Sequence, residues 1–222
     1  MDLRATIAAM ILSLVALTCM GVASAEDKNS AALPKGQERA LRVAQNQPAE
    51  TPASIYRNSI HAVFTIRSAH TLGTGFTFAS GLIATNAHVV GDSVTVEVEE
   101  QDGHTFQARV VRKDVDHDFA ILEPEGIRPF ATVVPLPKGD APAIGDGIVV
   151  IGSPGGLKGT VTAGIVSQNY PDGVVQLNVS VNPGNSGGPV FDMQGRVFGM
   201  ATFKYTKGDG IGFAIPISWL EQ

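Results

Sequence analysis

The sequence predicts an all-β fold from residue 55 onward, either a sandwich or a barrel. Three observations predict this class: short stretches in which apolar and polar residues alternate, frequent glycines and prolines between them, and no strong helical period between residues 55 and 215. Many short strands joined by such turns are typical of β-sandwiches and β-barrels.

Residues 1–25 have the pattern of a secretory signal peptide. Arg4 lies in a short basic start, residues 7–22 are almost all apolar, and Ala23-Ser24-Ala25 is a small-residue cleavage site. The competing interpretation is a membrane anchor, but a bilayer span needs about 20 apolar residues. We therefore expect cleavage, a location in the bacterial periplasm or outside the cell, and no stable membrane anchor.

Residues 26–54 are polar and rich in proline, which predicts a flexible linker, although residues 37–47 could form a short helix. The single cysteine, Cys19, lies in the leader, so we expect a mature chain without disulfides. The net charge of −5 and the lack of a long run of lysine or arginine argue against binding to nucleic acid.

Two hairpins are predicted within the β region. Valines alternate with polar residues over 94–98, a second alternating stretch covers 106–110, and Asp102-Gly103 between them suits a turn. The second hairpin joins 190–191 to 196–198. Further strands are expected at 147–151, 161–167 and 174–181, with a helix starting in 217–222.

Residues 182–190 place one serine, Ser186, among three glycines and two prolines. Glycine allows positive φ and close approach to the main chain, so such a turn can present a hydroxyl beside convergent N–H groups. Acyl transfer requires this combination of a nucleophile and oxyanion donors. We predict Ser186 as the nucleophile and the N–H groups of Gly184 and Ser186 as the oxyanion hole; the alternative is a structural turn with an incidental serine.

His88 is the predicted general base, because it lies in a polar segment between apolar runs and its ordinary pKa of about 6.5 suits proton transfer. Asp118 is the predicted acid that orients it. The rivals Asp114 and Asp116 lie in a stretch typical of a solvated turn, whereas Asp118 directly precedes an apolar run. The alternative for each is a structural or surface role.

Metal and phosphate chemistry are not predicted. The chain lacks the usual histidine and cysteine spacings of zinc sites, and Asp116-His117-Asp118 is at best a weak metal cluster. Residues 152–159 are rich in glycine but lack the spacing of a phosphate-binding loop. We therefore expect no cofactor.

Seven segments in order resemble the Deg/HtrA family of trypsin-like serine proteases. They are Gly73–Phe76, Thr85–Val90, Asp118–Leu122, Ile151–Gly156, Gly164–Ser167, Asn182–Val190 and Ile211–Pro216. The resemblance implies two six-stranded antiparallel β-barrels, at about 55–132 and 133–217, with a catalytic cleft between them. His88 and Asp118 would come from the first barrel and Ser186 from the second.

The resemblance covers the protease domain only, and no PDZ domain is expected in these residues. A homotrimer, common in the family, stays open. Digestive relatives have an aspartate before the nucleophile that pairs with a new N-terminus, but Asn185 is neutral. We therefore expect activity to be controlled by the ordering of loops 152–160 and 181–185 and not by cleavage of a propeptide. By analogy with the fold, Ser180 and Val179 would line the primary pocket. Because neither residue is acidic, we do not expect a preference for substrates with Lys or Arg at the cleavage site.

The predicted function is an exported serine endopeptidase that acts on unfolded proteins or peptides. The alternative is a trypsin-fold protein that is catalytically latent, or that acts as a binding or chaperone module, because a fold does not determine a function.

Overall fold

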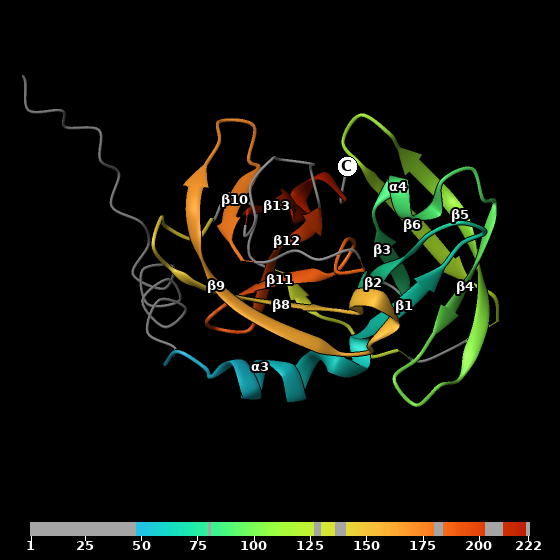
Figure 1. The fold of residues 1–222 in the computed structure, drawn as a ribbon, viewed down its shortest axis with the longest axis horizontal. Coiled ribbons are helices and arrows are strands. Elements are labelled where there is room, and N and C mark those ends of the chain that lie inside the picture. Colours follow the sequence, from blue (N-terminus) through green and yellow to red (C-terminus); the bar gives the residue numbers. More distant parts are fainter. Residues whose placement is uncertain are drawn as a thin grey trace, which may run out of the picture. The chain divides into compact units, whose positions relative to one another are not determined.

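The computed structural model describes residues 48–79, 81–126, 130–135, 141–179, 184–202 and 211–220. The predicted signal peptide, most of the predicted linker and the helix expected at 37–47 lie outside these residues. The predicted fold class is confirmed: the described chain forms two closed antiparallel β-barrels side by side (Figure 1).

The first barrel is a closed sheet with the strand order β1-β2-β3-β6-β5-β4. Its strands are β1 (Val63–Arg67), β2 (Leu72–Ala79), β3 (Leu82–Thr85), β4 (Thr95–Glu99), β5 (Thr105–Asp114) and β6 (Phe119–Pro124). Pairing of β1 with β4 closes it. The hairpin predicted around Asp102-Gly103 is confirmed as β4 and β5. Val94 precedes β4 and is exposed, whereas Val96 and Val98 are buried as their alternation predicts.

The second barrel has the strand order β11-β8-β9-β10-β13-β12 and closes through β11 and β12. Its strands are β8 (Gly147–Gly152), β9 (Thr160–Asn169), β10 (Val175–Asn178), β11 (Pro189–Asp192), β12 (Arg196–Thr202) and β13 (Ile211–Pro216). The short β7 (Val134–Pro135) adds a parallel edge to β12. The second predicted hairpin is confirmed as β11 and β12.

The helical segments are short. They are α3 (Pro52–Ser59), α4 (Ala87–Val90) and the single 3₁₀ turns η1 (Ile60–Ala62), η2 (Pro154–Gly156) and η3 (Ile217–Trp219). Helix α3 begins inside the segment that composition predicts as linker. Thr51 caps it reciprocally with Ser54, and Pro52 suits its first turn. Figure 1 shows α3 beside β8 and β9, where its one fully buried side chain, Ile55, joins the core.

A shared apolar core joins the two barrels. It contains Phe76 and Phe119 from the first barrel together with Ile151 and Phe191 from the second. Each barrel also has its own interior cluster. Because packed interiors resist sliding, this shared core sets the position of one barrel against the other and of the residues at their junction.

Among the described residues, no helix is both long enough and apolar enough to cross a membrane.

Candidate active site

His88 lies on α4, the single helical turn that follows β3. Asn86 precedes this turn in extended conformation. Val89 and Val90 are fully buried in the first barrel and hold one side of the turn inward. His88 therefore points outward, with 44% of its side chain exposed.

Asp118 lies in the turn between β5 and β6 and faces His88. Its carboxylate oxygens are 2.9 and 3.0 Å from His88 Nδ1, and the backbone N–H of His88 donates to the same carboxylate at 3.1 Å. Thr202, the last residue of β12, donates from Oγ1 to Asp118 Oδ2 at 2.7 Å. The first barrel thus brings the predicted acid and base together, and the second barrel adds a donor.

Burial of the Asp118 carboxyl group would raise its pKa, but hydrogen bonds from His88 and Thr202 outweigh burial and lower the pKa below its usual value. The group is therefore ionised near neutral pH. A carboxylate can only accept hydrogen bonds, so His88 Nδ1 must carry the proton. This tautomer leaves Nε2 as the ring nitrogen that can take up a proton.

The backbone of Asp118 has φ of +56°, the only positive value at a non-glycine residue in the described ranges. This region costs roughly 1–2 kcal/mol for a residue with a Cβ. The buried side chain of Asn86 donates from Nδ2 to the Asp118 carbonyl oxygen at 2.8 Å. Asn86 therefore helps to hold the turn that aims the carboxylate at His88.

Ser186 lies in a tight turn just before β11 and is 5% exposed. The Gly188 N–H closes this turn on the Asn185 carbonyl at 3.0 Å, and the Gly187 N–H donates to Ala201 of β12 at 2.8 Å. Gly187 has φ of +87°, where a side chain would be strained. In the described part of the chain no hydrogen bond joins Ser186 to His88, so the structure places the serine by its backbone only.

The predicted oxyanion donors lie in the same turn. Gly184 has φ of +106°, and a Cβ there would lie 2.5 Å from the Ser153 carbonyl oxygen. Glycine is therefore required for both conformation and space. Neither the Gly184 N–H nor the Ser186 N–H donates to another described residue. Both groups therefore remain the predicted donors.

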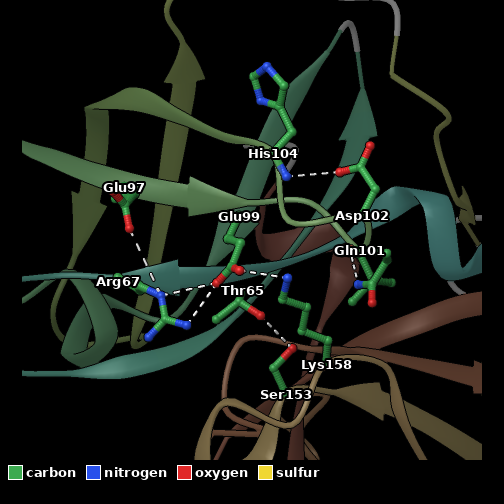
Figure 2. A network of polar contacts seen from close by, with 10 residues as sticks. Thr65, Arg67, Glu97, Glu99, Gln101, Asp102, His104, Ser153 and Lys158 are labelled. Carbon is green, nitrogen blue, oxygen red and sulfur yellow. Dashed lines mark hydrogen bonds and ion pairs between the residues drawn. The ribbon is translucent and has the colours of Figure 1, made fainter.

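The loop after β8 packs between this turn and the first barrel. Thr65 Oγ1 donates to Ser153 Oγ at 2.8 Å, and Lys158 Nζ lies 2.6 Å from Glu99 Oε1. Figure 2 shows Glu99 of β4 between Lys158 and Arg67. Hydrogen bonds from both cations lower the pKa of Glu99, and the bond from Lys158 has the larger effect. The loop is therefore attached to the first barrel by polar contacts.

The rival residues are placed elsewhere. Asp114 bonds His117, whose Nδ1 lies 2.9 Å from Asp114 Oδ2, and the described contacts link neither residue to His88. His117 also packs against the Trp219 ring at 4.5 Å between centroids, and 51% of its side chain remains exposed. Among the described residues, no three histidine, cysteine or acidic side chains gather as a metal site would require.

The predicted pocket residues are only partly described. Val179 is buried and packs in the interior cluster of the second barrel. Ser180 lies outside the described residues, so the primary pocket stays a prediction. A cavity of about 550 Å³ opens in the first barrel beside Phe64, Gln101 and Phe130, at the opposite end of β5 from Asp118.

Sequence reasoning missed Thr202 and gave Asn86 no separate role. Thr202 ends the apolar strand β12, and only the pairing of strands brings it to Asp118. Its one visible signal is a polar residue at the end of a run that is otherwise almost wholly apolar. Asn86 stands beside His88 in the sequence, but its bond to the Asp118 carbonyl spans 32 positions.

Residues 73–200 match the family model described as a trypsin-like peptidase domain. The chain is 38% identical over 162 residues to a probable periplasmic serine endoprotease, DegP-like, of Ectopseudomonas mendocina, covering 68% of this chain and 34% of the relative. It is 39% identical over 157 residues to the putative serine protease HhoA of Synechocystis, covering 65% of this chain and 40% of that relative. The chain spans about a third of the length of the first DegP-like relatives.

Two solved structures are similar to this one. The serine endoprotease from Yersinia pestis aligns with a TM-score of 0.70 and 32% identity, covering 79% of this chain and 65% of that chain. The inactive form of a Mycobacterium tuberculosis protein with a serine-to-alanine substitution aligns with a TM-score of 0.68 and 28% identity. The alignment covers 78% of this chain and 92% of that chain.

Proposed function

Because this chain belongs to the family of trypsin-like peptidase domains, we propose that it is an exported serine endopeptidase that hydrolyses peptide bonds of unfolded proteins. The observation that carries the proposal is the pair of His88 and Asp118, joined at 2.9 Å, on the barrel next to the turn of Ser186. The names of the relatives support export to the periplasm.

In the proposed mechanism His88 removes the proton of Ser186 through Nε2 while Oγ attacks the substrate carbonyl carbon. Asp118 keeps the Nδ1 proton in place and stabilises the imidazolium that forms. The N–H groups of Gly184 and Ser186 donate to the oxyanion. His88 then protonates the leaving amine, and water hydrolyses the acyl-enzyme by the same steps in reverse order.

A second proposal, left open by the sequence, is an enzyme that is latent until substrate orders the site; the missing hydrogen bond between Ser186 and His88 among the described residues is compatible with both proposals. Such hydrogen bonds are often long without substrate and tighten in the reactive complex. Latency and a purely binding function differ in outcome, because only a latent enzyme gains a reactive serine when unfolded protein is added.

Covalent labelling with a fluorophosphonate tests the proposal. The protein should be labelled, and Ser186→Ala should abolish labelling and casein cleavage while the protein stays folded. Labelling is repeated with unfolded casein and after heating to detect latency. A wild-type protein that stays unlabelled in all three conditions, or an S186A variant that cleaves casein as fast as wild type, contradicts the proposal.

A further inference from the structure

Thr74 is a fully buried residue of β2 that reaches from the first barrel to the turn before β11. We propose that Thr74 is a positioning residue that holds the oxyanion donors Gly184 and Ser186 in their reactive arrangement. The inference rests on the proposed function and adds a residue, on the other barrel, that would control its oxyanion site.

The Thr74 hydroxyl bridges two loops of the second barrel. Oγ1 donates to the Gly184 carbonyl oxygen at 2.5 Å and accepts from the Ser153 N–H at 2.9 Å. A hydroxyl has one proton to donate, and here that proton goes to Gly184. The direct bond from Ser153 N to Gly184 O is longer, at 3.4 Å, so the hydroxyl is the shorter link between these loops.

The backbone of Thr74 holds the same turn at a second point. Its N–H donates to the Ser186 carbonyl oxygen at 2.8 Å, and its own carbonyl accepts from Thr85 Oγ1 at 2.7 Å. The adjacent Gly73 leaves no room for a side chain, since a Cβ there would lie 2.5 Å from Val89 Cγ2 and 3.1 Å from the Ser186 carbonyl oxygen. Thr74 therefore binds the carbonyl groups of both residues whose N–H groups are the proposed oxyanion donors.

These contacts determine where the donors point because a peptide unit is planar. The Gly184 carbonyl belongs to the peptide unit that lies between the two donor N–H groups along the chain. Gly184 has φ of +106°, and glycine can leave this conformation at little steric cost. An anchored carbonyl restricts rotation of that unit, so loss of the hydroxyl should let the donors drift.

The experiment measures fluorophosphonate labelling rate against pH for wild type, Thr74→Val, Thr74→Ala and Thr74→Ser. Thr77→Val is the matched control. Thr77 is buried in the same strand and donates its hydroxyl to a backbone carbonyl, that of Ala131, but it is not bonded to the serine turn. The same methyl-for-hydroxyl exchange thus separates general damage to β2 from damage to the oxyanion site.

We expect T74V and T74A to lower the plateau rate about 100-fold, the loss typical of a 1 Å misplacement. Thr74→Ser should restore most of the rate, and T77V should remain close to wild type. The midpoint of the pH–rate profile should not move in any variant, because Thr74 Oγ1 is not bonded to His88 or Asp118.

If a folded T74V or T74A variant is labelled at the rate of T77V, the inference about Thr74 is overturned while the proposed function stands. A Thr74→Ser variant that is labelled as slowly as T74V has the same consequence. A shifted pH midpoint in T74V also overturns it, because the effect would then act through the acid and base. If T74V does not fold, T74A, which loses the same hydroxyl with a smaller side chain, decides. A wild-type protein that is not labelled overturns the proposed function and this inference together.

Discussion

Replacement of Thr202 by valine removes one hydrogen bond to Asp118 and changes little else. Valine has nearly the shape of threonine, and Thr202 is 1% exposed, so packing should be retained. The lost bond, from Oγ1 to Oδ2, is 2.7 Å long and has an ionised acceptor. The two bonds from His88 remain, which makes this variant a measure of a single interaction.

Hydrogen bonds to charged groups contribute about 1.5–3 kcal/mol. Because only 22% of the Asp118 side chain is exposed, solvent can replace the lost donor only in part. We therefore expect T202V to lower the free energy of unfolding by about 1.5–3 kcal/mol at pH 7. For a domain of this size each kcal/mol lowers Tm by roughly 2–4 °C, so Tm should fall by roughly 3–12 °C.

The effect should depend on pH in one direction. The pKa of Asp118 is lowered in the folded state, so its interactions stabilise the fold above the unfolded-state pKa of about 3.9 and are lost as pH falls through the folded-state value. The stability difference between wild type and T202V should therefore be complete at pH 7 and should shrink below about pH 4.

Thermal unfolding of both proteins in an S186A background, which prevents self-cleavage, measures this difference from pH 7 to pH 3. Thr77→Val is the control, because its hydroxyl donates to a neutral carbonyl and its stability loss should not change with pH. A T202V penalty that is the same at pH 3 as at pH 7 would refute the reasoning.

Two further substitutions test the serine turn. Gly184→Ala should lower the labelling rate by about 10²–10³-fold, because a Cβ would lie 2.5 Å from the Ser153 carbonyl oxygen and displace a donor; Gly145→Ala, which has positive φ but open space, controls for strain and should label normally. Asn185→Asp should destabilise the protein by several kcal/mol at pH 7, since residue 185 is buried and its Oδ1 accepts no hydrogen bond from any described residue. Chemical denaturation measures this, and a variant as stable as wild type would contradict it.

Much of the fold was predictable because local patterns carry it. The alternation of Val96 and Val98 with polar neighbours places them inside the first barrel, and the turn at Asp102-Gly103 joins β4 to β5 as predicted. Helix α3 was missed because its eight residues are too few for a clear period, although Thr51 and Pro52 form a recognisable start.

The choice of Asp118 over Asp114 and Asp116 was also available from the chain, because only Asp118 directly precedes a buried run. The positive φ of Asp118 could not be predicted from the chain. It arises from a turn held by Asn86, which lies between β3 and α4 and is distant in the sequence. The two threonines gave little signal: Thr74 resembles other strand threonines in the sequence, and Thr202 stands out only as a polar residue at the end of an apolar run.

Local spacing was therefore sufficient to predict the two hairpins and to propose the serine turn and the acid and base, because periods of two residues and glycine-rich turns act over short distances. Only the packed barrels decided which side chains support them. Thr74 meets Gly184 across 110 positions, and Thr202 meets Asp118 across 84. Such pairs depend on strand register and on the shared apolar core, which arise only when the whole chain has folded.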